Sequence, residues 1–187
     1  MFLSKEEIQK IGFKSVGDNV LISDKASIYG ASRISIGNNV RIDDFCVLSA
    51  GEGGIILGNN IHIAVYCSFI GNGEIILEDF SGTSSKVAIY SSNDDYSGAF
   101  LTNPTVPSLY TKVTSGKVHL KKHVIVGAGS IILPNVTLEE GVAIGSLSLV
   151  NRSIPEYTIA VGSPAKPLKS RKRDLKKLEW KYLNQYK

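Results

Sequence analysis

The sequence contains few residues that could serve as metal ligands or redox groups. It has only two cysteines and three histidines among 187 residues. Neither set shows the close spacing of a zinc site, so we expect no metal cofactor. Cys46 and Cys67 each follow an aliphatic strand residue by four positions, and we expect both to be buried free thiols.

Long apolar runs are also missing. No stretch approaches the roughly 18 apolar residues of a membrane span, and the charged residues Lys5, Glu6 and Glu7 differ from the apolar region of a signal peptide. We therefore expect a cytoplasmic protein without stable membrane insertion. The net charge is only +4, and the basic segment 166–187 lacks an aromatic-interleaved nucleic-acid motif. We expect no nucleic-acid partner.

The sequence does contain a strong six-residue period. Aliphatic residues recur at every sixth position of the stretch 120–150, namely Leu120, Val126, Ile132, Leu138, Ile144 and Val150. This period fits neither a helix nor an alternating strand. It is typical of a parallel β-helix, in which each hexapeptide forms one short strand and one corner.

The same register extends upstream. Successive triplets are each predicted to form one coil of a triangular prism: Val16–Ile22–Ile28, Ile36–Ile42–Leu48, Leu57–Ile63–Phe69 and Leu77–Thr83–Ile89. The period is broken once, over residues 90–117, by a polar stretch with two prolines. A loop of this length is often functional, so we expect it to carry part of the site; a plain excursion is the alternative.

Both ends of the chain are predicted to be helical. Ser4–Glu7 form a capping-box pattern that indicates a short helix within 1–15, which closes the first coil. The β-helix is predicted to cover 16–165. A basic helix follows within 166–187, from about Leu168 to Tyr186, with an apolar stripe packed on the coils: Leu175, Leu178, Tyr182 and Leu183. The prediction is one all-β domain over residues 1–187.

Several motifs resemble a known family. The repeat, the excursion and the segments Val126–Ser130, Ile144–Ser146 and Val161–Lys166 resemble the left-handed β-helix hexapeptide acyltransferases. Within them, the chain is similar to the galactoside and maltose O-acetyltransferases and to the acetyltransferases of surface polysaccharide assembly. The resemblance implies a left-handed prism, a homotrimer with active sites between subunits, acetyl-CoA as donor, and a sugar or glycan precursor as acceptor.

The resemblance also implies where coenzyme A binds. By matching position, the pantetheine arm falls on Gly127, Ala128, Ser146 and Leu147. The phosphates of coenzyme A need cationic partners, and Lys166 and Arg171 are the best-placed basic residues. The alternative is that these two residues carry surface charge only.

The catalytic histidine of the family is absent. One family pattern places Asp94 at its position and another places Asp95 there. His62 takes the position of an asparagine that, in the galactoside type, faces the histidine of the next subunit. We therefore expect His62 to be the general base, oriented by Asp94 or Asp95 of a neighbouring chain; a structural corner residue is the alternative. His119 and His123 are expected at the surface.

The remaining expectations concern the acceptor and the reaction. A backbone N–H near Ser81–Gly82 or Gly127 could stabilise the developing oxyanion. O-acetylation in surface polysaccharide biosynthesis is the first hypothesis. N-acetylation of a nucleotide-linked amino sugar is the second, weakly favoured by the missing histidine, and a catalytically inactive binding scaffold is the third. Acceptor contacts are expected from the excursion, at Tyr90, Asn93, Tyr96 and Asn103.

Overall fold

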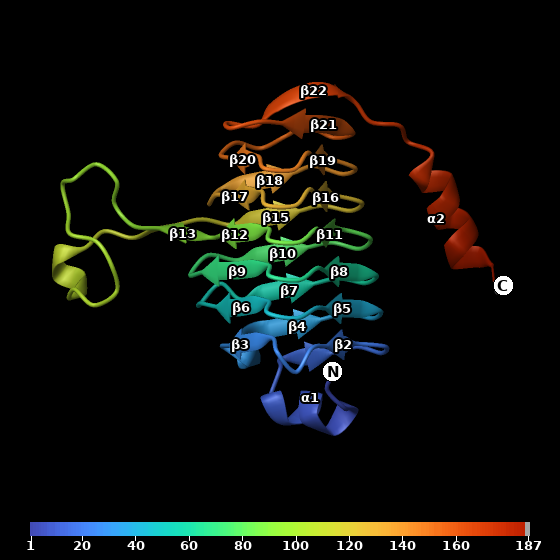
Figure 1. Cartoon of the computed structure of the whole chain (residues 1–187), viewed down its shortest axis with the longest axis horizontal. Coiled ribbons are helices and arrows are strands. Elements are labelled where there is room, and N and C mark those ends of the chain that lie inside the picture. Colours follow the sequence, from blue (N-terminus) through green and yellow to red (C-terminus); the bar gives the residue numbers. More distant parts are fainter. Residues whose placement is uncertain (186–187) are drawn as a thin grey trace.

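Three parallel sheets form the faces of a triangular column (Figure 1). The structure, a computed structural model, describes residues 1–185. The first face contains β1 (Ser15–Val16), β4 (Ile34–Ile36), β7 (Ile55–Leu57), β10 (Ile75–Leu77), β15 (Val118–Leu120) and β18 (Val136–Leu138). The second face contains β2 (Leu21–Ile22), β5 (Val40–Ile42), β8 (Ile61–Ile63), β11 (Gly82–Thr83), β16 (Ile125–Val126), β19 (Ala143–Ile144), β21 (Thr158–Val161) and β22 (Lys166–Ser170). The third face contains β3 (Ser27–Tyr29), β6 (Val47–Ala50), β9 (Ser68–Gly71), β12 (Ala88–Tyr90), β17 (Ile131–Ile132) and β20 (Leu149–Val150).

Consecutive strands belong to the first, second and third faces in turn. Three strands therefore make one coil, and each strand pairs in parallel with the equivalent strand of the next coil, for example Ile36 with Leu57. The fold is a left-handed parallel β-helix, as predicted. We call the turns from the first to the second face the first corner, those from the second to the third face the second corner, and those from the third back to the first face the third corner.

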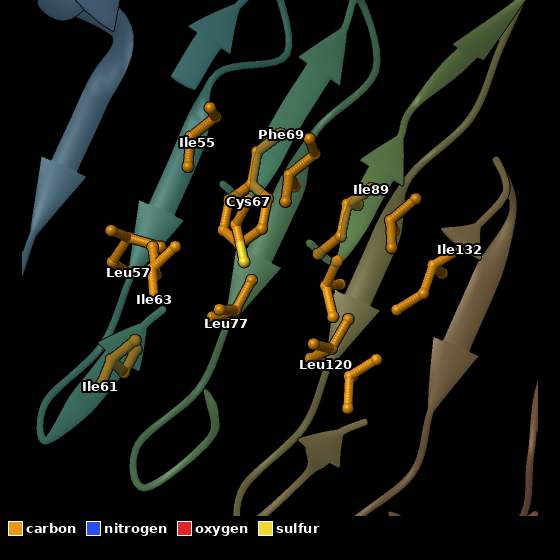
Figure 2. Close-up of a cluster of buried hydrophobic side chains, with 14 of the residues drawn as sticks. Ile55, Leu57, Ile61, Ile63, Cys67, Phe69, Leu77, Ile89, Leu120 and Ile132 are labelled. Atoms are coloured by element: carbon orange, nitrogen blue, oxygen red, sulfur yellow. The ribbon is translucent and has the colours of Figure 1, made fainter. Parts of the chain in front are cut away.

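The residues of the six-residue period fill the interior of the column. From Ile36 to Val150, every residue of the predicted triplets is at most 3 % exposed. Figure 2 shows several of them, stacked from coil to coil. Burial of each large aliphatic side chain contributes roughly 1.5–3 kcal/mol. Cys46 and Cys67 are free and buried, and their thiols donate to the carbonyls of Ala64 and Ser84, both at 3.1 Å; this confirms the prediction for both cysteines.

Asparagine as well as glycine forms the tight corners of the column. At the first corner, Asn19, Asn39 and Asn60 adopt a left-handed backbone conformation and hydrogen-bond to one another along the column. Gly127 has no left-handed φ; it is required because a Cβ there would lie 2.5 Å from the backbone nitrogen of Ser146. Close stacking of coils, rather than backbone freedom, explains this glycine.

The N-terminal helix and the excursion match their predictions. At the start of α1 (Lys5–Ile11), the Ser4 hydroxyl accepts a hydrogen bond from the backbone nitrogen of Glu7, and the Glu7 carboxylate accepts one from the backbone nitrogen of Ser4. The excursion leaves at the third corner through β13 (Ser92–Asn93), paired with β14 (Thr114–Ser115). Beyond this ribbon it extends away from the column and includes one short 3-10 turn, Ser108–Tyr110 (Figure 1). A second such turn, Ala31–Arg33, precedes β4.

The C-terminal segment differs from its prediction. Residues Lys166–Ser170 form β22, antiparallel to β21, and only Leu175–Asn184 form a helix, α2. The strand forms because the last coil exposes an unpaired strand edge, which a following segment can cover. The predicted apolar stripe packs on the coils only in part: Leu178 and Leu183 are 64 % and 53 % exposed, whereas the Tyr182 ring lies edge-on to Phe80 and its hydroxyl donates to Oδ1 of Asn60. Tyr186, where the predicted helix ends, and Lys187 lie outside the described residues.

Within residues 1–185, neither helix combines the length and the apolar character needed to cross a bilayer.

Candidate active site

A row of outward side chains crosses the second face of the column. Arg41, His62, Gly82 and Ile125 occupy equivalent places on successive strands and pair in register. They point outward because their strand neighbours point into the core. Gly82 has no side chain, so the row is interrupted by an open groove of about 340 Å³. The groove is lined by His62, Ala64, Gly82, Thr83, Ser84, Ser85 and Ile125.

His62 has a carboxylate partner within its own chain. Its Nε2 lies 2.8 Å from Oδ2 of Asp43, and Oδ1 of Asp43 accepts a hydrogen bond from Nε of Arg41 at 2.7 Å. Partial burial raises the pKa of Asp43, but the hydrogen bonds from His62 and Arg41 outweigh it, and the pKa is lowered overall. Because Asp43 is therefore ionised near neutral pH, Nε2 of His62 carries the proton and Nδ1 is the nitrogen able to accept one.

Sequence reasoning missed Asp43 and placed His62 at a corner. His62 lies in the middle of β8, on the outer face. The available signal was the alignment of coils: Arg41 and His62 share a register position, which brings Asp43 next to the imidazole of the following coil. Nineteen residues separate the two partners along the chain.

Asp94 and Asp95 do not meet His62 within one chain. The Asp95 carboxylate accepts hydrogen bonds from the Ser97 hydroxyl and the Gly98 nitrogen, and the Ser97 bond is the main reason that its pKa is lowered. Asp94 is exposed. Both lie on the excursion, which extends from the third corner on the side of the column away from β8 (Figure 1). Contact between chains stays a prediction.

The four residues predicted to hold the pantetheine arm do lie together. Gly127 and Ala128 occupy the second corner on one coil, and Ser146 and Leu147 occupy it on the next, where the Leu147 nitrogen donates to the Ala128 carbonyl. Leu147 is 79 % exposed, so this ridge is open to a ligand. On the other side the ridge continues to the groove, because the Gly129 nitrogen donates to the carbonyl of Ser85.

Lys166 and Arg171 do not form one basic cluster. Lys166 is exposed and pairs with Val161 at the end of β21 nearest the second corner. Arg171 instead reaches the first corner, where Nη1 donates to the carbonyls of His123, Gly141 and Val142. Burial lowers the pKa of Arg171. Its guanidinium therefore has a structural task, and a role for either residue in binding coenzyme A stays a prediction.

The predicted acceptor residues are spread along the excursion. Tyr90 ends β12 and Asn93 lies in β13, whereas Tyr96 is 92 % exposed. The Asn103 carboxamide accepts from the backbone nitrogen of Thr105 at 3.0 Å. Their role in acceptor binding also stays a prediction.

His119 and His123 are not simple surface residues. Nε2 of His119 lies 2.7 Å from Oε1 of Glu78. His123 is only 8 % exposed, stacks on Phe80 and lies 2.9 Å from Oε2 of Glu179 in α2. The expectation was wrong for His123 because α2 covers it. Within residues 1–185, no group of three or more side chains is arranged to bind a metal ion.

Comparisons with known proteins identify relatives of the chain. No family model matches the sequence. The chain is 57 % identical over 178 residues to the dTDP-4-amino-4,6-dideoxy-D-glucose acyltransferase of Escherichia coli. The matched region covers 95 % of this chain and 93 % of the relative. The chain is also 27 % identical over 160 residues to the putative lipopolysaccharide biosynthesis O-acetyl transferase WbbJ of Escherichia coli K12. This match covers 83 % of the chain and 78 % of that relative.

Solved structures of acyltransferases also resemble this chain. AntD, an N-acyltransferase from Bacillus cereus in complex with dTDP and 3-hydroxybutyryl-CoA, is 51 % identical, with a TM-score of 0.95 over 98 % of this chain and 97 % of that one. Its S84C variant, in complex with dTDP-4-amino-4,6-dideoxyglucose and coenzyme A, is 50 % identical with the same TM-score and coverage. A maltose O-acetyltransferase from Clostridium difficile 630, at 24 % identity and a TM-score of 0.58 over 90 % and 75 % of the chains, shares the fold.

Proposed function

Because this chain belongs to the hexapeptide-repeat acyltransferases of the left-handed β-helix fold, we propose that it transfers an acyl group from acyl-coenzyme A to the amino group of a nucleotide-linked amino sugar. The observation that carries the proposal is the 57 % identity, over 95 % of the chain, to an acyltransferase of such a sugar. O-acetylation, the first hypothesis from the sequence, becomes the second candidate.

The missing family histidine is consistent with an amine acceptor. A neutral amine attacks a thioester without prior removal of a proton, so a strong base is unnecessary at that step. Once the C–N bond has formed, the nitrogen is positively charged and strongly acidic, and a carboxylate can accept its proton. The C–S bond then breaks, the departing sulfur takes the proton back from the carboxylic acid, and coenzyme A leaves as its thiol. A hydroxyl acceptor needs a base from the start.

Asp94 is our candidate for that carboxylate and Ser84 for the oxyanion donor. Ser84 lines the groove, and its hydroxyl makes no hydrogen bond within the described residues. AntD structures have been determined with substitutions at its Ser84 and Asp94, and this chain, nearly equal in length, has a serine and an aspartate at the same numbers. The hydroxyl can donate to the oxygen of the thioester carbonyl as negative charge develops on it.

The backbone donors expected from the sequence are already engaged. The nitrogens of Ser81, Gly82 and Gly127 donate to the carbonyls of Glu78, Val124 and Ile144, respectively. They hold neighbouring coils or their own turn together and are not free to stabilise an oxyanion. A backbone donor elsewhere near these residues stays a prediction, and we propose the Ser84 side-chain hydroxyl as the donor.

The excursion supports an active site between subunits. Within one chain it extends away from the groove (Figure 1), and it exposes several large apolar side chains, including Leu109 and Tyr110. We propose a homotrimer in which the excursion of one subunit covers the groove of the next and brings Asp94 to it. The column would then hold acyl-coenzyme A along the ridge of Gly127, Ala128, Ser146 and Leu147.

The second candidate function, O-acylation, is favoured by the His62–Asp43 pair. An imidazole whose Nε2 is held by a carboxylate can accept a hydroxyl proton at Nδ1. His62 is thus the base in this candidate, whereas in N-acylation it lies beside the acceptor without being needed for proton removal.

A direct assay distinguishes the functions. The purified protein is incubated with acetyl-CoA or 3-hydroxybutyryl-CoA and dTDP-4-amino-4,6-dideoxyglucose. The matched control acceptor is the same dTDP-sugar with a hydroxyl at C4. Thiol release and the mass of the sugar product are measured. We expect release with the amino sugar only. Release only with the hydroxyl sugar would support O-acylation, and failure to bind coenzyme A would support the scaffold hypothesis.

A further inference from the structure

Two aromatic side chains stack on each other at the surface of the second corner. The rings of Phe45 and Tyr66 lie 5.0 Å apart, centroid to centroid, with an angle of 14° between their planes. Phe45 is 46 % exposed and Tyr66 is 53 % exposed, so the pair presents a flat apolar surface to solvent. Such a surface suits a planar ligand, because nucleobases stack on aromatic side chains.

The pair belongs to the same column of corner residues as the ridge for coenzyme A. Phe45, Tyr66, Lys86, Gly129 and Leu147 take equivalent places on successive coils, all with left-handed φ angles between 58° and 71°. The Tyr66 nitrogen donates to the Asp44 carbonyl and the Lys86 nitrogen to that of Val65, which fixes this register. The groove lies beside this column at the level of Ser84 and Ser85.

This order of corner residues places coenzyme A and the acceptor on opposite sides of the groove along the column. Coenzyme A takes the C-terminal side of the groove, from Gly127 onward. The free direction along the corner is therefore N-terminal, toward Tyr66 and Phe45. Coils are roughly 4.8 Å apart, so Phe45 lies about 10 Å below Ser84, which leaves room for a sugar and a diphosphate.

Charge around the pair suits a diphosphate. Lys86 is exposed, lies one coil above Tyr66 and makes no ion pair with any residue from 1 to 185. Below the pair, Nζ of Lys25 lies 5.4 Å from the Phe45 ring centroid, although it also pairs with Asp44. An unpaired ammonium next to an aromatic platform can bind the phosphates of a stacked nucleotide.

A second hollow lies near the pair. It has a volume of about 330 Å³ and is lined by Phe2, Arg41, Asp43, Asp44 and Val65. Asp44 and Val65 directly precede Phe45 and Tyr66 in the chain. Asp43 is also the partner of His62, which lines the groove. The hydrogen-bonded pair of His62 and Asp43 thus has one member in the lining of each hollow.

We propose that Phe45 and Tyr66 form the stacking platform for the base of a nucleoside diphosphate, the nucleotide half of the acceptor, and that Lys86 binds its diphosphate. The inference rests on the proposed function, because it assigns the nucleotide part of that acceptor to this corner. A second copy of the chain covering the pair is the competing occupant, and the test below is designed to reveal it.

The test measures binding by isothermal titration with dTDP, thymidine and coenzyme A. The variants are Phe45→Asn and Tyr66→Asn, because asparagine adopts the same left-handed conformation at the first corner. Tyr29→Asn, which removes an exposed aromatic side chain from the third face, is the matched control. Lys86→Gln separates the phosphate contact from the stacking contact.

We expect each aromatic variant to bind dTDP and thymidine about 5- to 140-fold more weakly, the ratio that corresponds to the loss of one base stack. Coenzyme A binding should be unchanged, and Tyr29→Asn should resemble the wild type. Lys86→Gln should weaken dTDP about tenfold or more and leave thymidine unaffected.

Three results would overturn the inference. They are equal dTDP affinity in the aromatic variants, no dTDP binding by the wild type, and loss of the native oligomer in Phe45→Asn or Tyr66→Asn by light scattering, which would make the pair a subunit contact. The failure of the proposed function is distinct: it is the absence of acyl transfer to the amino sugar by the wild-type protein. A wild type that acylates the sugar while the aromatic variants keep its dTDP affinity would refute only the platform.

Discussion

Replacement of Asp43 by asparagine tests whether His62 takes part in proton transfer. The Asp43 carboxylate accepts hydrogen bonds from both Arg41 and His62, at 2.7 and 2.8 Å. Asparagine has nearly the same shape but only one acceptor oxygen. If that oxygen stays with Arg41, the amide NH₂ faces Nε2 of His62, which must then become the acceptor. The proton moves to Nδ1, and His62 loses its capacity to act as a base there.

The expected cost in stability is small. Hydrogen bonds to charged groups contribute about 1.5–3 kcal/mol when buried, but the side chains of Arg41 and His62 are both 55 % exposed, which places these contacts nearer the surface range of about 0–1 kcal/mol. We therefore expect a loss of about 1 kcal/mol in the free energy of unfolding. For a chain of this size the Tm falls by about 2–4 °C.

The pH dependence of this loss has a definite sign. The pKa of Asp43 is lowered in the folded protein, so its contribution is present above the pKa of the unfolded chain, about 3.9, and is lost as the pH falls through the folded value. The difference in stability between wild type and Asp43→Asn should thus be present at pH 7 and should vanish in acid. Denaturant unfolding at a series of pH values measures it.

Activity decides between the two candidate reactions. If Asp94 accepts the proton from an attacking amine, Asp43→Asn should keep kcat/KM for the amino sugar within a few-fold of wild type, although nitrogen NMR of His62 shows the new tautomer. Asp94→Asn, measured in parallel, should lose most activity. A loss of a hundredfold or more in Asp43→Asn, with dTDP and coenzyme A affinities unchanged, would refute this reasoning and make His62 the base.

Three further predictions concern the oxyanion donor, the C-terminal helix and the core. Ser84→Ala should lower kcat about 10²- to 10³-fold with little change in KM, as measured by thiol release, because it removes one donor to the thioester oxygen; an unchanged kcat would exclude Ser84 from that role. Glu179→Gln should weaken the docking of α2, because Glu179 pairs with both His123 and Lys122. Burial raises the pKa of Glu179, but its hydrogen bonds with Lys122 and His123 lower the pKa by more, so the net pKa lies below the ordinary value for glutamate. In the wild type, the docking of α2 should therefore weaken as the pH falls through that lowered pKa, whereas the glutamine variant should lack this dependence. Hydrogen exchange over α2 reports the docking, and equal protection in both proteins at every pH would contradict the prediction. Phe69→Ala should destabilise the column by about 3–5 kcal/mol in denaturant unfolding, because Phe69 is fully buried between coils; a loss below 1 kcal/mol would mean that the coils collapse around the cavity.

The interior of the column was predictable from the sequence because its determinants are local and periodic. Each strand pairs only with the strand one coil away, so the residue at every sixth position must face the core. This placed Leu120, Val126 and Ile132 correctly, together with the buried thiols of Cys46 and Cys67. The break in the period likewise marked the excursion, and the capping box marked α1.

The predictions for the outer surface were less accurate, because outward side chains obey no period. The pairing of His62 with Asp43 depends on which outward residues become neighbours when coils of unequal length stack. The burial of His123 depends on α2, which lies 56 residues later at Glu179. The position of β22 depends on the free edge that the last coil leaves, and the sequence pattern of Lys166–Ser170 gives no sign of a strand.

By itself, then, the sequence determined the column, its register and the corner that carries Gly127, Ala128, Ser146 and Leu147, because burial of every sixth side chain admits only one winding register. Only the tertiary structure decided which polar groups meet on the outside. There, contacts such as those of Asp43 with His62, Phe45 with Tyr66, and Glu179 with His123 arise between distant segments whose side chains are held together by the stacking of coils rather than by any local preference.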